Sequence, residues 1–109
     1  MQQLECNECG SATVISVKGD LLAAEALAIS QVVANGASQP NIVIDFDACR
    51  FFASVGLEAL LGALRACEER GGRLMLAGLD KNCRKILEIT RLEHRFECHP
   101  EVASALKVL

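Results

Sequence analysis

Two short apolar segments constrain the fold of this sequence more than any other feature. Residues 41–46 (NIVIDF) are mostly apolar and β-branched, and residues 73–77 (RLMLA) form a second apolar run that ends at Gly78. Strands of this kind are typical of the interior of a parallel sheet, where helices cover both faces. The sequence therefore predicts an α/β fold in which five strand residues are largely buried: Ile42, Val43, Ile44, Leu74 and Leu76.

The other elements follow from residue periodicity and turn signals. Residues 13–17 are expected to pair with the N-terminal residues in a hairpin, and a short edge strand is expected around residues 95–98. Helices are predicted at residues 21–34, 54 to about 70, 81 to about 91, and after Pro100. This order predicts one domain over residues 1–109, with a mostly parallel sheet, an antiparallel N-terminal edge strand and crossover helices.

The apolar spacing also predicts which side of each helix is buried. In the first helix Asp20 is the expected N-cap, Asn35-Gly36 is the expected stop, and Glu25 lies off an apolar stripe formed by Leu22, Ala26, Ile29 and Val33. In the third predicted helix the inward residues are Ile86, Leu87 and Ile89.

Charge and hydropathy exclude two classes of partner. Eleven basic and fourteen acidic residues give a net charge of −3, so the basic surface required for nonspecific nucleic-acid binding is absent. The sequence has no secretion signal and no apolar run of about 18 residues, the length typical of a membrane span. We therefore expect a cytoplasmic protein that neither binds nucleic acid nor inserts into a membrane.

Six cysteines are present, but their setting argues against disulfides. Cys49, Cys67, Cys83 and Cys98 lie in or beside apolar segments, where cysteine behaves as a small apolar residue. Cys6 and Cys9 form a CxxC pair without a second pair to complete a zinc site, and they precede a turn and a strand rather than a helix. We expect free, buried, reduced thiols and no bound metal.

The sequence gives little support to an enzyme. Asp45, Asp47, His94 and His99 are the candidates for acid–base chemistry, but no Ser-His-Asp or Cys-His arrangement and no phosphate-binding glycine loop is evident. Asp45 has an alternative role, which is to cap the loop that follows its strand. We therefore predict no catalytic residues and no cofactor.

A longer pattern points to a family. An apolar strand that ends in Asp (residues 42–46, IVIDF) is followed by a short loop and by FFASVGL at residues 51–57. Downstream come GGRLMLAG at residues 71–78 and CRKILEITRL at residues 83–92. Over about residues 12–106 this order resembles the STAS domain family, in particular its anti-sigma-factor antagonists.

The resemblance implies a function and its site residues. Ser54 falls on the serine that these antagonists present for phosphorylation, Gly56 on the motif glycine and Leu57 on the apolar residue after it. Two positions depart from the pattern, because Ala53 replaces the usual Asp and Val55 replaces a frequent Ser or Thr. The implied function is phosphorylation-switched binding of an anti-sigma factor, often itself a serine kinase, with a phosphatase that resets the serine.

Two surfaces are predicted to bind the partner. One is the start of the second helix, with Val55, Gly56, Leu57, Glu58 and Leu61; the other is a basic group on the third helix, with Lys81, Arg84 and Lys85. Each has a simpler explanation, since Ser54 could be an ordinary N-cap and the basic group a solvated helix face. The alternative function is that of a STAS subunit that supports the ATPase of a lipid-transport complex.

Overall fold

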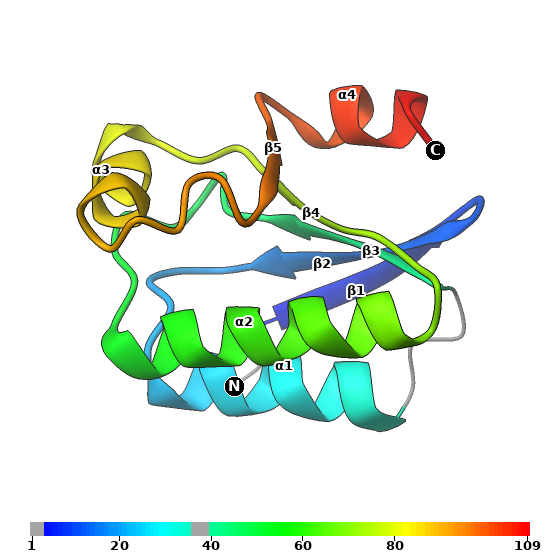
Figure 1. The fold of residues 1–109 in the computed structure, drawn as a ribbon, viewed down its shortest axis with the longest axis horizontal. Coiled ribbons are helices and arrows are strands. Elements are labelled where there is room, and N and C mark those ends of the chain that lie inside the picture. Colours follow the sequence, from blue (N-terminus) through cyan, green and yellow to red (C-terminus); the bar gives the residue numbers. More distant parts are fainter. Residues whose placement is uncertain (1–3, 36–39) are drawn as a thin grey trace.

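The computed structural model describes residues 4–35 and 40–109 and contains one five-stranded sheet (Figure 1). The spatial order of the strands is the same as their sequence order: β1 (Leu4–Cys9), β2 (Ala12–Val17), β3 (Asn41–Asp45), β4 (Leu74–Ala77) and β5 (Glu97–His99). β1 is antiparallel to β2, whereas β2 to β5 are parallel to their neighbours. The predicted α/β fold and its antiparallel N-terminal edge strand are therefore confirmed.

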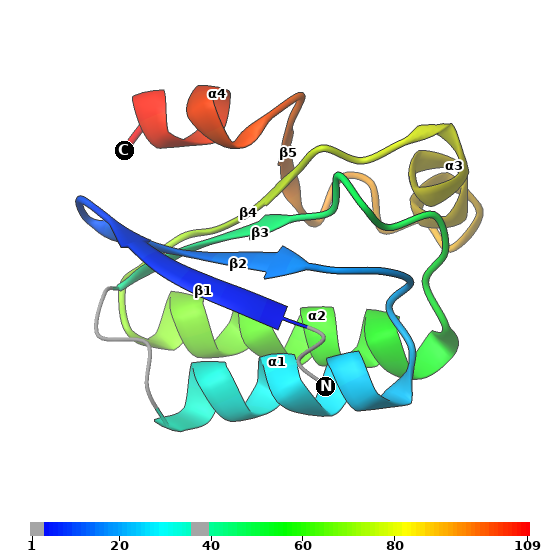
Figure 2. The ribbon, with the colours of Figure 1, turned by 180° about the vertical axis from the view of Figure 1, so that it is seen from behind.

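Four helices connect or follow these strands: α1 (Ala23–Asn35), α2 (Ser54–Glu69), α3 (Lys81–Ile89) and α4 (Val102–Lys107). α1 and α2 lie side by side on one face of the sheet, and the short α4 lies on the other (Figures 1 and 2). α3 lies at the end of the molecule where α2 begins (Figures 1 and 2). The start of α2 and the outer side of α3 thus lie at a common end of the molecule (Figures 1 and 2).

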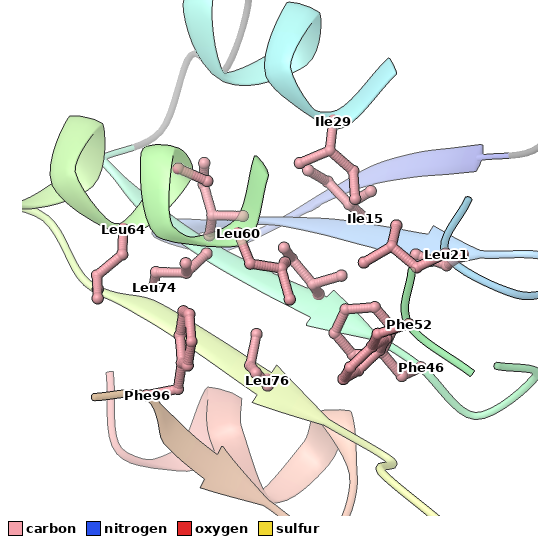
Figure 3. Packing of buried hydrophobic residues seen from close by; sticks show 14 of the residues in the cluster. Ile15, Leu21, Ile29, Phe46, Phe52, Leu60, Leu64, Leu74, Leu76 and Phe96 are labelled. Atoms are coloured by element: carbon pink, nitrogen blue, oxygen red, sulfur yellow. The ribbon is translucent and has the colours of Figure 1, made fainter. Parts of the chain in front are cut away.

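The sheet separates two apolar clusters. The larger one joins alternate residues of the central strands, such as Ile42, Ile44 and Leu76, to the inner sides of α1, α2 and α3. Figure 3 shows Leu76 of β4 in this cluster with Ile29 of α1 and Leu60 of α2. The smaller one joins Val43 and Met75 on the opposite face to Ala105 of α4. Because both faces of β3 and β4 are covered, their continuous apolar sequences are explained and their predicted burial is confirmed.

The start of α1 differs from the prediction. The helix begins at Ala23, and Asp20 does not cap it, because an Asp20 carboxylate oxygen accepts the Arg50 backbone N–H at 3.0 Å. Glu25 takes the capping role, since its side chain accepts the Leu22 N–H at 3.1 Å and is buried for that reason. The predicted placements of Leu22 and Glu25 are therefore reversed, with Leu22 47% exposed and Glu25 6% exposed.

Two further side chains point away from the core. Ile89 is 70% exposed, because it follows the buried Leu87 by two positions, which is about half a helical turn. Cys98 is exposed on the edge strand β5, whereas Cys49, Cys67 and Cys83 are buried as expected. The predictions of an inward Ile89 and a buried Cys98 were wrong.

Candidate functional site

Ser54 is the first residue of α2, not its cap. The N-cap position belongs to Ala53, whose backbone is extended (φ −74°, ψ 161°) and whose side chain cannot accept a hydrogen bond, so no side chain caps this helix end. Ser54 itself is exposed to solvent. The structure therefore excludes the simple capping role that the sequence left open for Ser54, and it places the hydroxyl-bearing residue at the positive end of a 16-residue helix.

Leu21 holds the loop before α2 in place. Its N–H donates to the Phe51 carbonyl oxygen and its own carbonyl oxygen accepts the Ala53 N–H, each at 2.9 Å. The next turn of the helix packs on the same residue, because a Cβ atom at Gly56 would lie 2.7 Å from the Leu21 Cγ atom. Gly56 is thus buried, and its role in the structure is to let α2 approach Leu21 closely.

Exposed apolar side chains lie close to Ser54 along the chain and through this pairing. Val55 follows it directly and is 46% exposed; Phe51 precedes it by three residues and is 49% exposed. Leu22, next to the Leu21 that pairs with this loop, is also exposed. Leu22 and Phe51 were not predicted as site residues. The sequence did not distinguish them, because Leu22 fits the apolar stripe of its helix and Phe51 lies in an irregular loop.

The other predicted residues of α2 differ in accessibility. Glu58 is exposed, whereas Leu57 and Leu61 are half-buried and pack against the larger apolar cluster. The structure therefore brings Ser54, Val55 and Glu58 to the surface. Leu57 and Leu61 can offer only part of their side chains to a partner.

Charged groups connect the loop before α2 to the start of α3. Arg50 lies 3.7 Å from a carboxylate oxygen of Asp80, and its backbone N–H donates to Asp20. Asp80 is the N-cap of α3 and accepts the Cys83 N–H at 2.9 Å; this hydrogen bond holds the pKa of the Asp80 carboxyl group below its usual value. The two surfaces predicted from the sequence are thereby linked.

The basic group of α3 is at the surface. Lys81, Arg84 and Lys85 are all exposed, and the Arg84 side chain donates to the Leu79 carbonyl oxygen at 3.4 Å. Because α3 and the start of α2 share one end of the molecule (Figures 1 and 2), a single partner could contact both. Contact between a partner and either surface stays a prediction.

Asp45, an acidic candidate for catalysis, has a structural role. A carboxylate oxygen of Asp45 accepts the Asp47 N–H at 3.0 Å, which is the loop-capping role that the sequence left open. Among residues 4–35 and 40–109, no three His, Cys, Asp or Glu side chains are placed to hold a metal ion. Within the same residues no helix has the length and apolarity that crossing a membrane requires.

Comparisons with known proteins agree with this fold. An anti-sigma factor antagonist from Mycobacterium paratuberculosis superimposes with a TM-score of 0.81 at 28% identity, over 96% of this chain and 91% of that one. A putative anti-sigma factor antagonist from Thermotoga maritima gives a TM-score of 0.84 at 14% identity, over 95% and 92% of the two chains. The phosphorylated form of the Bacillus cell fate determinant SpoIIAA gives 0.70 at 22% identity, over 97% and 99%.

Family membership rests on the sequence as well as on the fold. No curated protein matches the chain by sequence. The STAS domain profile, however, matches residues 3–105, which is nearly the whole chain and includes every strand and the first three helices. This chain belongs to the STAS domain family.

Proposed function

We propose that this protein is an anti-sigma-factor antagonist, a binding protein rather than an enzyme, and that phosphorylation of Ser54 switches its binding. One observation carries the proposal: Ser54, which the sequence resemblance assigns to the family's phosphorylated position, is exposed at the first position of α2, a helix end without a side-chain cap. Support also comes from the 28% identical antagonist of Mycobacterium paratuberculosis, which has the same fold.

The helix start is suited to carrying a phosphoryl group. The group brings about −1.5 to −2 charges at neutral pH, and these interact favourably with the positive end of the helix dipole. Ala53 supplies no side-chain cap, and the first turn of α2 contains no acidic residue that would repel the group. Phosphorylation of Ser54 should therefore leave the fold intact.

The surroundings of Ser54 explain how phosphorylation would release a partner. The exposed side chains of Leu22, Phe51 and Val55 give this end of the molecule an apolar character. A partner that packs against them must also desolvate a phosphorylated Ser54, and a buried, unpaired charge costs several kcal/mol. The unphosphorylated protein would bind and the phosphorylated protein would dissociate.

The partners follow from the family and from the charges of α3. The first is an anti-sigma factor that is also a serine kinase, and the second is a phosphatase that restores Ser54. Lys81, Arg84 and Lys85 would contact acidic groups of the anti-sigma factor. The proposed activity requires no cofactor and takes place in the cytoplasm, without contact to nucleic acid and without membrane insertion.

Capture of the partner from an extract of the source bacterium tests this proposal. The bait is the unmodified protein, Ser54→Ala, Ser54→Asp or Ser11→Asp. Ser11 is an exposed serine in the turn between β1 and β2, at the opposite end of the molecule (Figure 1). We expect the unmodified protein, Ser54→Ala and Ser11→Asp to capture an anti-sigma factor, and Ser54→Asp to fail.

The identity of the captured protein separates the two functions. Recovery of a transport ATPase or its permease in place of an anti-sigma factor would support the lipid-transport alternative and contradict antagonism. Recovery of an anti-sigma factor equally well by Ser54→Asp would contradict the switch while leaving the binding function in place.

A further inference from the structure

Cys49 and Cys83 are buried together at the end of the molecule that carries Ser54. Cys49 lies in the loop between β3 and α2, Cys83 lies in the first turn of α3, and both residues are 0% exposed. The Cys83 Sγ atom lies 3.6 Å from the Cys49 carbonyl oxygen, and the Cys49 thiol donates to the Phe51 carbonyl oxygen at 3.3 Å. The Cys83 thiol thus contacts the backbone of a residue 34 positions away in sequence, and the two side chains are close enough to share a hydrogen bond.

The two thiols differ in acidity because of this contact. A hydrogen bond from the Cys83 side chain, together with the backbone groups of Phe51 and Leu21, lowers the pKa of Cys49 to about 7, against the opposing effects of burial and of Asp20. The same hydrogen bond, burial and the nearby Asp80 raise the pKa of Cys83. Cys49 is therefore the more acidic of the two thiols.

We propose that Cys49 and Cys83 form a redox site that hydrogen peroxide oxidises to an intramolecular disulfide. The Cys49 thiolate attacks one peroxide oxygen; the O–O bond breaks, Cys49 becomes a sulfenic acid, and the leaving hydroxide takes up a proton to become water. The Cys83 sulfur then attacks the Cys49 sulfur: the S–S bond forms, the S–O bond of the sulfenic acid breaks, and the departing hydroxide takes up the Cys83 proton to become the second water. Two thiols lose two electrons and two protons, and one peroxide is reduced to two waters.

The other buried cysteine lacks this arrangement. Cys67 contacts the Arg70 guanidinium group at 3.9 Å, and burial raises the pKa of its thiol. Cys98 is exposed, and its thiol donates to the carbonyl oxygen of Phe96. The Cys49–Cys83 pair is therefore distinguished by a thiol partner and a lowered pKa rather than by burial alone.

A disulfide at this site would tie the loop before α2 covalently to α3. The loop contains Phe51 and the N-cap residue Ala53, and the Arg50–Asp80 ion pair already connects it to α3. Peroxide, which is nearly as small as water, reaches the buried pair through local opening of this loop. An effect of the disulfide on partner binding rests on the proposed function, whereas the redox site itself does not.

Peptide mapping of the peroxide-treated protein tests the proposal without any partner. The reduced protein is treated with hydrogen peroxide at neutral pH and unfolded in the presence of an alkylating reagent, and its peptides are then analysed by mass spectrometry. We expect residues 49 and 83 to escape alkylation and to appear in one cross-linked peptide pair that has lost two hydrogens. Dithiothreitol should restore both thiols.

Two variants sharpen the result. Cys67→Ala removes a buried thiol outside the pair and should leave the cross-link unchanged, whereas Cys49→Ala should leave Cys83 reduced and open to alkylation in denaturant. The proposal is overturned if residues 49 and 83 stay alkylatable at peroxide concentrations that oxidise the exposed Cys6 and Cys98. Oxidation of Cys49 to a sulfinic acid without a link to Cys83 would also overturn it. The map of the unmodified protein decides the matter even if Cys49→Ala fails to fold.

Discussion

An N-cap residue usually combines an extended backbone with a side chain that accepts a hydrogen bond, but at the start of α2 these two features belong to different residues, Ala53 and Ser54. Ala53 has the extended backbone of an N-cap but no hydrogen-bonding side chain, while Ser54 has the hydroxyl group but already lies within the helix. The first backbone N–H groups of α2 consequently have no side-chain acceptor, which costs stability.

Replacing Ala53 with Asp should therefore stabilise the protein. A carboxylate at the N-cap would accept an N–H of the first turn and interact with the helix dipole, and we expect the free energy of unfolding to rise by about 1 kcal/mol. Urea denaturation measures this change. The Ala53→Asn variant separates the effect of the hydrogen bond from that of the charge. If both variants unfold at the same urea concentration as the unmodified protein, the N–H groups at this helix end do not need a side-chain cap.

Gly56 and Gly62 lie in the same helix and should respond in opposite ways to alanine. A Cβ atom at Gly56 would lie 2.7 Å from the Leu21 Cγ atom and 2.9 Å from the Leu21 carbonyl oxygen, so Gly56→Ala should destabilise the protein by about 1–3 kcal/mol. At Gly62 nothing lies within 4 Å, and Gly62→Ala should stabilise α2 by up to about 1 kcal/mol. Changes of the same sign in thermal unfolding would contradict the close packing of α2 on Leu21.

At the scale of elements, an ion pair adds to the strand pairing that holds the short edge strand β5. The Arg73 guanidinium group donates to both carboxylate oxygens of Glu97, at 2.7 and 2.6 Å, and also to the Val108 carbonyl oxygen at 3.0 Å. The arginine thereby connects the start of β4 to β5 and to the residue that caps the end of α4. Its main effect on Glu97 is to hold the pKa of that carboxyl group below its usual value.

This lowered pKa predicts how stability depends on pH. A carboxyl group whose pKa is lower in the folded protein stabilises the fold above its unfolded pKa, and this contribution disappears as the pH falls through the folded pKa. Glu97→Gln should therefore reduce stability at neutral pH and flatten its decline in acid. Melting temperatures between pH 3 and pH 7 measure the effect, and Arg73→Gln should reproduce it. If stability falls as steeply at low pH in both variants as in the unmodified protein, the Arg73–Glu97 ion pair is not the source of this pH dependence.

The accuracy of sequence-based prediction differed among the elements for physical reasons. β3 and β4 were predictable because their apolar runs leave no alternative to burial on both faces. The roles of side chains at helix ends were not predictable, because they depend on contacts between residues that are distant in sequence. Asp20 binds the Arg50 N–H across 30 positions, and no local spacing indicates this bond. Likewise, the contact between Cys49 and Cys83 exists only once the loop meets α3.

At the scale of the whole molecule, the candidate surfaces lie at one end. The start of α2, the loop before it and α3 share this end, whereas the turn of the β1–β2 hairpin lies at the other (Figures 1 and 2). The reason is that β2, β3 and β4 are parallel, so their carboxyl ends all lie at the same end of the molecule. The segments that follow these strands therefore begin there. Changes at the hairpin turn therefore serve as controls for changes near Ser54.

The central claim is that a negative charge at Ser54 removes partner binding without disturbing the fold. Titration calorimetry with the purified anti-sigma factor tests it most directly. Because Ser54 makes no capping bond, Ser54→Ala should bind like the unmodified protein. Ser54→Asp should bind at least about 100-fold more weakly, since desolvating its charge costs several kcal/mol, and Ser11→Asp should bind normally. Equal affinities for the Ala and Asp variants of Ser54 would contradict the account.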